Sequence, residues 1–293
     1  MSTLYPSSFN GLAAWAREHN IAVTEARLRF AQYTMLRAIA GSRALSASLV
    51  FKGGNALDFM WQPNRSTLDL DFSTAREVSD VDAEGDLLAD LFARALTVVE
   101  REFGVYCRVA RVERQPPGTG KTFVTYYIRI AYALPDQAPL RRRMEAGPRL
   151  ASQGIEIEVS INEPICADRQ FDIAGTNPLR VSTVEDIVAE KLRALLQQAI
   201  RNRARPQDLL DIAVVLRAGP PLDRANVANF LLRKAAARNV PVSRAAFHNP
   251  EIMVRANRGY AELATTTRTL FIPFEEARVA LYSFVDELDI PTD

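Results

Sequence analysis

Two aspartates separated by one residue carry the chemistry that this sequence offers most plainly. Asp69 and Asp71 lie in the run "STLDLDFST", whose alternation of apolar and polar residues predicts a strand over residues 66–74. In a strand, residues i and i+2 project to one face, so both carboxylates are aimed at the same point. Two like charges held that close repel each other unless a cation lies between them. Because hard divalent ions such as Mg²⁺ take oxygen ligands of this kind, the pair predicts a metal site.

A glycine turn upstream of these aspartates is suited to phosphate. The run "SLVFKGG" over residues 48–54 predicts a strand that ends in Lys52, Gly53 and Gly54, and "NALDFMW" predicts a short helix after it. Backbone N–H groups at such a helix start can bind phosphate oxygens. A D-x-D strand alone is common and equally fits a solvent-facing edge, so the combination with the glycine turn is the more specific signal. Three further residues could contact phosphate or orient the acidic strand: Asn55, Arg65 and Ser66.

A third carboxylate could complete a two-metal site. The run "GIEIEVSINEP" over residues 154–164 predicts another strand, with Glu156 and Glu158 on one face. Either glutamate could be the third ligand. An ordinary exposed strand position is the alternative for both.

Charged residues on two predicted helices form a second candidate cluster. Lys191 lies inside an otherwise amphipathic helix, where it could neutralise a triphosphate or be a solvated surface residue. Asp208 and Asp211 are three residues apart and therefore share a helix face. Asp208 could only complement the helix dipole, whereas Asp211 could orient Lys191, Arg203 or Arg205, or act as a base. The two arginines could bind phosphate or be surface residues.

The stretch "QPPGTGKT" over residues 115–122 is similar to a nucleotide-binding P-loop, but it departs from it in sequence and context. Gln115 stands where the motif needs its first glycine. The flanking runs "VYCRVARVER" and "FVTYYIRIAY" both predict strands, whereas a P-loop must open a helix. We therefore expect a hairpin loop here, and a substitution of Lys121 should leave activity unchanged.

The pattern of elements predicts an α+β fold followed by a helical region. Residues 10–45 and 81–104 favour helices, with Thr24 as an N-cap, and strands alternate with them. We expect a domain over residues 1–172 with a mixed β-sheet and helices, and a helical C-terminal domain over residues 173–293. Local signals place three helix ends in the second domain: Thr183 as an N-cap with Asp186, Pro206 at a first helical position, and Gly219 at a helix end.

Composition argues against several classes of protein. The chain has 293 residues, 48% apolar and 24% charged, with two cysteines and two histidines, which argues against a zinc centre and a Ser-His-Asp hydrolase. No apolar run reaches the length of a membrane span, and the first residues lack a secretion signal, so we expect a reduced, cytoplasmic protein without membrane contact. Residues 191–258 contain thirteen Lys and Arg against four Asp and Glu. This segment could attract nucleic acid or be a solvated face.

Taken together, these stretches resemble the DNA-polymerase-β-like nucleotidyltransferases. They are more closely similar to the AbiEii/AbiGii-type nucleotidyltransferase toxins of abortive-infection and toxin–antitoxin systems. Four stretches within residues 51–216 carry the resemblance: "FKGGNAL", "RSTLDLDF", "IEVSINEP" and "VEDIVAEKLRALL…RARPQDLLDIAVVL". The third matches the family's strand through Glu158 and Glu163. Gln207 and Leu210 depart from the family pattern, where a basic and an aromatic residue are frequent.

The resemblance implies a nucleotidyltransferase-like fold and transfer of a nucleoside monophosphate from a nucleoside triphosphate to an RNA acceptor, plausibly the 3′ end of tRNA. It implies Mg²⁺, with Mn²⁺ as the alternative ion, and a cognate antitoxin protein. The implied residues are Asp69, Asp71, Lys191 and Asp211 for catalysis, Asp69, Asp71 and Glu158 for metal, and Lys52, Gly53, Gly54, Asn55, Arg65, Ser66 and Asp208 for nucleotide. The alternatives are a phosphotransferase of the same fold that modifies a protein, a non-catalytic binding module, and a P-loop ATPase.

Overall fold

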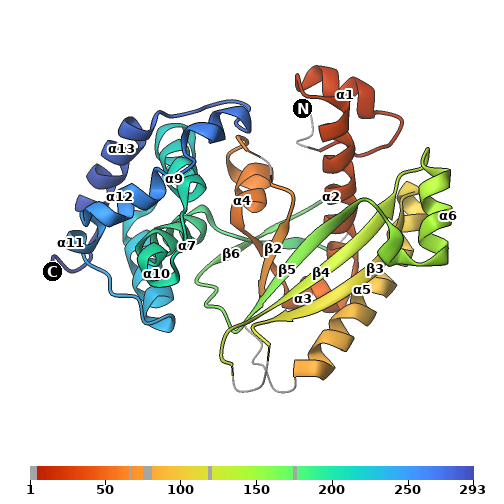
Figure 1. Ribbon diagram of the computed structural model, residues 1–293, viewed down its shortest axis with the longest axis horizontal. Helices are drawn as coiled ribbons and strands as arrows, with labels where there is room; N and C mark the ends of the chain where they lie inside the picture. The colour runs from red at the N-terminus through yellow and green to blue at the C-terminus, as the bar shows by residue number, and fades with distance from the viewer. Residues whose placement is uncertain (1–4, 66, 75–80, 118–120, 174–176) are drawn as a thin grey trace. The chain divides into compact units, whose positions relative to one another are not determined.

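A mixed β-sheet and many helices make up the chain (Figure 1). The computed structural model describes all residues except 1–4, 66, 75–80, 118–120 and 174–176. Within the described residues, seven strands form one sheet in the order β3-β4-β5-β2-β1-β7-β6. The strands are β1 (Val50–Lys52), β2 (Leu70–Thr74), β3 (Tyr106–Gln115), β4 (Val124–Ala133), β5 (Gly154–Ile161), β6 (Asp168–Phe171) and β7 (Leu179–Ser182). The α+β fold expected from the sequence is confirmed.

The chain divides into two compact units. Unit 1 comprises residues 1–51, 68–162 and 170–180, and unit 2 comprises residues 52–67, 163–169 and 181–293. The helices of unit 1 are α1 (Leu12–Glu18), α2 (Val23–Gly41), α3 (Arg43–Ser48), α5 (Val81–Phe103), α6 (Ala138–Ala146) and the 3₁₀ turn η2 (Pro148–Leu150). Those of unit 2 are α4 (Gly53–Ala56), the π-helix η1 (Leu57–Trp61), α7 (Val184–Leu196), α8 (Gln198–Arg201), α9 (Pro206–Ala218), α10 (Arg224–Ala237), α11 (Arg244–Phe247), α12 (Pro250–Ala256), the 3₁₀ turn η3 (Ala261–Thr265) and α13 (Phe274–Asp286).

In unit 1, the sheet has one apolar face and one polar face. Strand β5 pairs parallel with β2 and antiparallel with β4, and β4 pairs antiparallel with β3. Alternate residues such as Phe72, Tyr126 and Val159 are buried, and α5 packs on their side, because Gly85 of α5 lies against the Tyr126 ring. The opposite side carries Asp71, Glu158 and the other residues that share their alternation, and we call it the polar face.

The hairpin expected around the P-loop-like stretch is confirmed. Strands β3 and β4 are antiparallel neighbours, with Gln115 opposite Thr125, so no helix follows Lys121. Gly118, Thr119 and Gly120 lie outside the described residues. A stretch that joins two strands lacks the helix N-terminus that a P-loop uses to hold phosphate.

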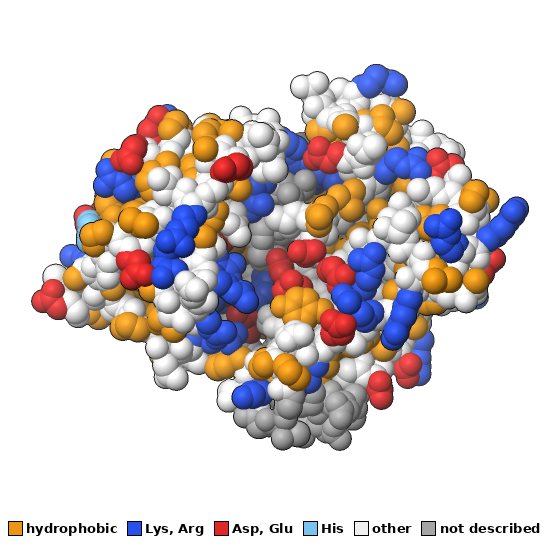
Figure 2. Space-filling model, in the orientation of Figure 1, with side chains coloured by type: hydrophobic (Ala, Val, Ile, Leu, Met, Phe, Trp, Pro, Cys, Tyr) orange, Lys and Arg blue, Asp and Glu red, His pale blue; other side chains and the backbone are white. Residues whose placement is uncertain are grey.

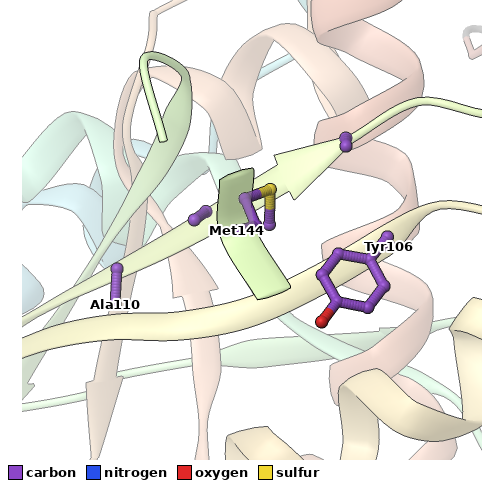
Figure 3. Packing of buried hydrophobic residues seen from close by; sticks show 5 residues of the cluster. Tyr106, Ala110 and Met144 are labelled. Atoms are coloured by element: carbon purple, nitrogen blue, oxygen red, sulfur yellow. The ribbon is translucent and has the colours of Figure 1, made fainter. Parts of the chain in front are cut away.

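A small apolar cluster attaches α6 to the strands of unit 1. Met144 of α6 is buried together with Tyr106 and Ala110 of β3 and Ala131 and Ala133 of β4 (Figure 3). Ala131 and Ala133 alternate with the buried Tyr126 series, so α6 lies on the polar face of the sheet.

Helix ends in unit 2 follow the signals that the sequence carries. The Thr183 hydroxyl accepts a hydrogen bond from the Asp186 amide (3.3 Å) as N-cap of α7. Pro206 is the first residue of α9, and Gly219 is its C-cap. These three predictions are confirmed, because capping depends on local chemistry.

Two local predictions were wrong. Helix α2 begins at Val23 with Ala22 as N-cap and without a side-chain cap, so Thr24 lies inside the helix. Strand β2 begins at Leu70, whereas the alternation predicted a start at Ser66. The amide of Asn55 bonds both the N–H and the C=O of Thr67 (3.1 and 3.0 Å), which takes this part of the chain out of strand pairing. Asp69 therefore lies just before the strand that carries Asp71.

Candidate active site

In unit 1, carboxylates gather on the polar face where β2 and β5 run side by side. Asp71 is the direct register partner of Glu158. Neighbouring strands are about 4.8 Å apart and register partners point to the same face, so the two side chains are adjacent. Asp69 lies one residue before β2, and burial together with the nearby charge of Glu156 raises its pKa. The structure thus places Asp71 beside Glu158, and Asp69 near Glu156.

Glu156 and Glu158 have different surroundings. The Glu156 carboxylate forms ion pairs with Arg129 of β4 (3.3 Å) and Arg111 of β3 (3.7 Å). Glu158 is adjacent to Asp71 on one side and opposite Tyr127 on the other. Glu156 is therefore held by arginines, while Glu158 stands directly beside an aspartate.

The donor chemistry of this face suits a hard cation. Among the described residues, no three His, Cys, Asp or Glu side chains converge closely enough to form a finished coordination shell. Asp71 and Glu158, with Asp69 beside them, nonetheless supply the carboxylate oxygens that Mg²⁺ prefers. The face fits a divalent ion in the type and adjacency of its donors.

In unit 2, a buried ion-pair cluster connects α7 with α9. The Lys191 ammonium contacts Asp208 Oδ1 at 2.9 Å and Asp211 Oδ2 at 2.8 Å. Burial acts to lower the pKa of Lys191, but the carboxylates of Asp211 and Asp208 outweigh it and raise that pKa. Lys191 is therefore a buried lysine that is charged at neutral pH, and not a solvated surface residue.

Asp211 is held by two cations. Arg65 Nη2 lies 3.1 Å from Asp211 Oδ2, the same oxygen that contacts Lys191. Burial acts to raise the pKa of Asp211, but Lys191 and Arg65 outweigh it and lower that pKa. A carboxylate stabilised in this way is a weak base, so the arrangement suits orientation of Lys191 and Arg65 better than proton abstraction.

The glycine turn lies against this cluster within unit 2. Gly53 has a left-handed φ of 73°, and Lys52 is the N-cap of α4. A Cβ added at Gly54 would meet Thr67 Cγ2 at 3.3 Å and Arg65 Nη2 at 3.5 Å. Asn55 is fully buried, and its side-chain amide forms hydrogen bonds with both the N–H and the C=O of Thr67. It therefore fixes the loop that carries Arg65. Ser66 lies outside the described residues.

The remaining arginines of this region play a smaller part in the cluster. Arg205 Nε approaches Asp208 Oδ2 at 3.9 Å, while Arg203 is exposed.

The carboxylates of unit 1 and the ion-pair cluster of unit 2 both lie within a stretch of the chain that is shared with known proteins. A family model, "Nucleotidyl transferase AbiEii toxin, Type IV TA system", matches residues 35–279. The chain belongs to this family.

A solved structure supports the fold of this AbiEii family member. MenT4, a nucleotidyltransferase toxin of Mycobacterium tuberculosis, is similar with a TM-score of 0.59 and 19% identity over 95% of this chain and 90% of that chain. A crystal structure of an H. pylori protein has a TM-score of 0.48 and 15% identity, over 90% and 93% of the two chains. JHP933 from Helicobacter pylori has a TM-score of 0.46 and 15% identity, over 92% and 90%. No curated protein matches the chain.

In this AbiEii-family chain, Glu163 was noted in the sequence only as a match to the family pattern. Glu163 is buried, accepts a hydrogen bond from the Lys52 ammonium and lies 3.6 Å from Arg238 Nη2 of α10. It therefore fixes the side chain of Lys52 at the start of the glycine turn. The signal was its place just after β5, but its partners lie 111 and 75 residues away in the sequence, which no local pattern reveals.

The anchor of the segment between the glycine turn and Arg65 was likewise not predicted from the sequence. Asp58 is buried and forms an ion pair with Arg268, and it accepts a hydrogen bond from the Asn64 backbone (2.8 Å). The Asn64 side chain in turn bonds Leu270 through both its backbone C=O (3.1 Å) and its N–H (2.8 Å). The available signal was an acidic residue inside "ALDFMW", a run whose other residues are apolar.

Substitution of the turn glycines is expected to have small, separable effects. Gly53→Ala forces a side chain into a left-handed conformation, which costs about 1–2 kcal/mol of unfolding free energy. Gly54→Ala adds a methyl group against Thr67 and Arg65, so transfer activity should fall more than stability does. Urea unfolding measures the loss of stability, and a nucleotide-transfer assay measures the loss of activity. An unchanged transfer rate in Gly54→Ala would show that the turn is not part of the active site.

Within the described residues, no helix is both long and apolar enough to cross a membrane.

Proposed function

We propose that this AbiEii-family nucleotidyltransferase moves a nucleoside monophosphate from a nucleoside triphosphate to an RNA acceptor, with the 3′ end of tRNA as the substrate and Mg²⁺ or Mn²⁺ as the cofactor. The observation that carries the proposal is the adjacency of Asp71 and Glu158 on neighbouring strands. Two carboxylates that lie side by side repel each other and attract a cation, and the family membership supports a nucleotide substrate.

The residues have the following roles in this proposal. Asp69, Asp71 and Glu158 hold divalent metal, which when bound would stabilise the entering and leaving oxygens of the displacement. Lys191 and Arg65, both oriented by Asp211, bind phosphate oxygens of the nucleotide. Lys52 and the turn of Gly53 and Gly54 complete the phosphate contacts. Asn55 and Asp208 keep Arg65 and Lys191 in place.

The chemical step is a displacement at phosphorus. The acceptor hydroxyl oxygen forms a bond to the α-phosphorus, the bond from that phosphorus to the bridging oxygen breaks, and pyrophosphate leaves. The hydroxyl proton passes to solvent. Asp211 is not its acceptor, since Lys191 and Arg65 keep that carboxylate a weak base.

The biological role in this proposal is that of a cytoplasmic toxin with a cognate antitoxin. The type IV toxin–antitoxin description of the family supports an antitoxin partner. A toxin that modifies the 3′ end of tRNA would stop translation, and the antitoxin would oppose that effect.

A label-transfer experiment tests the proposed function. The purified protein is incubated with total tRNA, Mg²⁺ or Mn²⁺, and each of the four nucleoside triphosphates labelled at the α-phosphate. We expect label in RNA with the wild type and none with Asp71→Ala. The nucleoside triphosphate whose label enters RNA fastest identifies the donor. Label that enters protein from a γ-labelled triphosphate, with none in RNA, would instead establish the phosphotransferase.

A further inference from the structure

The polar face of unit 1 changes its charge along the strands. One cross-strand row contains Asp71, Glu158 and Tyr127, and the next contains Glu156, Arg129 and Arg111. The third row contains Gly154, Ala131 and Arg108, where Gly154 leaves room for the Arg129 guanidinium, 3.1 Å from the site of its missing Cβ. The face therefore runs from carboxylates, through paired arginines and glutamates, towards arginines.

Helix α6 closes the basic end of this face. Met144 fixes α6 on Ala131 of the third row and on Ala133 beyond it. The helix and its C-terminal turn present four arginines: Arg141, Arg142, Arg143 and Arg149. Figure 2 shows Lys and Arg side chains gathered over α6 and the adjoining parts of β3 and β4, and Asp and Glu side chains over β5.

Three of these arginines carry a charge that no ion pair within the described residues compensates. Arg142 and Arg143 are exposed, and within the described part of the chain neither has an ion-pair partner. Arg149 is exposed and donates one hydrogen bond to the Ala110 carbonyl (3.2 Å), which fixes its guanidinium beside the strands without neutralising it. This surface can therefore bind an anion without first breaking an ion pair.

The base of the surface is held rigid by arginines that are paired. The guanidinium groups of Arg108 and Arg141 lie over the Tyr106 ring, 4.0 and 4.7 Å from its centre. Both arginines also lie within ion-pair distance of Glu100 (2.8 and 3.8 Å). These interactions hold α6 against β3, so the unpaired arginines project from a fixed frame.

The spacing identifies the kind of anion. Gly154 precedes Glu158 by four residues on β5, which corresponds to about 13 Å along the strand. A stacked nucleic-acid strand rises about 3.4 Å per nucleotide, so about four nucleotides span this distance. A mononucleotide whose α-phosphate lies at the carboxylates is too short to reach α6, whereas a polynucleotide acceptor is long enough.

We propose that the acceptor RNA lies along the polar face of unit 1, with its reacting end at Asp71 and Glu158 and its upstream phosphates on Arg142, Arg143 and Arg149. Tyr127, half-buried beside Glu158, offers a ring on which a base can stack. This inference rests on the proposed RNA acceptor and adds the surface that binds it. Phosphate interactions of this kind position the strand without reading its sequence.

Two triple variants with the same change in charge test the surface. Arg142→Ala/Arg143→Ala/Arg149→Ala removes the α6 arginines. Arg17→Ala/Arg43→Ala/Arg94→Ala is the matched control, because these three arginines are exposed on α1, α3 and α5. Binding of an unstructured single-stranded RNA and of total tRNA is measured by fluorescence anisotropy over a range of salt concentrations. Michaelis constants for RNA and for the nucleoside triphosphate come from the label-transfer assay.

We expect the α6 variant to bind RNA at least about tenfold more weakly and to lower the slope of log affinity against log salt by about 2, since each phosphate that an arginine neutralises adds about 0.7 to that slope. Its Michaelis constant for RNA should rise while that for the triphosphate stays unchanged, and the control should behave as wild type. Equal RNA binding by the two variants would overturn the inference, as would parallel shifts in both constants.

Two further outcomes separate this inference from the proposed function. A wild type that transfers no label to RNA refutes the RNA nucleotidyltransferase, while the binding comparison still decides the surface. If circular dichroism shows that the α6 variant is unfolded, Arg142→Ala and Arg143→Ala are measured singly. Each should then lower the salt slope by about 0.7, and an unchanged slope in both would refute the surface.

Discussion

Replacement of Asp71 by asparagine is expected to lower the rate of nucleotide transfer by a factor of about 10³ or more, while the protein stays folded. The amide keeps the shape of the side chain but removes the charge that, in the proposed mechanism, binds a divalent ion beside Glu158. Loss of such a ligand removes several kcal/mol of transition-state stabilisation, and about 4 kcal/mol corresponds to a factor of 10³. The measurement is the initial rate of α-label transfer, with circular dichroism to verify the fold.

The two glutamates of β5 provide a matched control for this result. Glu158→Gln should lower the rate nearly as much as Asp71→Asn and raise the metal concentration needed for half-maximal rate. Glu156→Gln should have a small effect, because it only weakens ion pairs with Arg129 and Arg111, whose side chains are 33% and 44% exposed. Exposed pairs of this kind contribute about 0–1 kcal/mol. Equal losses in both glutamate variants would contradict Glu158 as the metal ligand.

The second large effect is expected at Lys191. Lys191→Met removes the cation that neutralises Asp208 and Asp211, both of which are buried. An uncompensated buried charge costs about 3–5 kcal/mol, so the free energy of unfolding should fall by about that amount, and activity with it. Urea denaturation measures the loss. If Lys191→Met is as stable as the wild type, the cluster has no structural role.

A double variant separates the ion pair from the packing of the lysine stem. The double variant Lys191→Met/Asp208→Asn should lose less free energy of unfolding than the two single variants lose together, because the second change removes a charge that the first left unpaired. If the losses of unfolding free energy are additive, the two side chains act independently. Activity should remain low in every combination, since Lys191 also binds phosphate in the proposed mechanism.

The pH dependence of stability follows from the same pKa shifts. The raised pKa of Lys191 means that its contribution is fully present below the unfolded value of about 10.4 and is lost as pH rises through the folded value. The lowered pKa of Asp211 means that its contribution is present above about 3.9 and is lost as pH falls through its folded value. Between about pH 5 and 9 this cluster should therefore add no slope to the free energy of unfolding.

Much of the fold could be predicted because its signals are local. Three of these features depend only on residues within a few positions of each other: the alternation in β5, the caps at Thr183 and Gly219, and the hairpin between β3 and β4. The start of β2 was misplaced because Asn55, 12 residues upstream, holds the Thr67 backbone. A hydrogen bond of that kind overrides the alternation and leaves no trace in the strand's own sequence.

The candidate site was predictable in its residue types but not in its pairings. The D-x-D run indicated carboxylate chemistry, but β2 and β5 are neighbours in the sheet although the β3–β4 hairpin separates them in the sequence. The register of β5 with β2 places Glu158 beside Asp71, and its register with β4 places Glu156 beside Arg129. The pairing of Lys191 with Asp211 was among the alternatives that helix spacing suggested, and the structure shows it. Burial of Lys191 depends on two helices packing together, which spacing within one helix cannot reveal.

The anchor at Asp58 has a consequence for when this protein can act during its synthesis. Asp58 and Asn64 lie in the segment that carries the glycine turn and Arg65, and they are held by Arg268 and Leu270, over 200 residues later in the chain. Translation must therefore continue past Leu270 before Asp58 and Asn64 have these partners. A nascent or prematurely terminated chain that ends before Arg268 would lack the ion pair between Asp58 and Arg268, so we expect such a chain to hold the segment of the glycine turn and Arg65 less firmly and to transfer nucleotide more slowly.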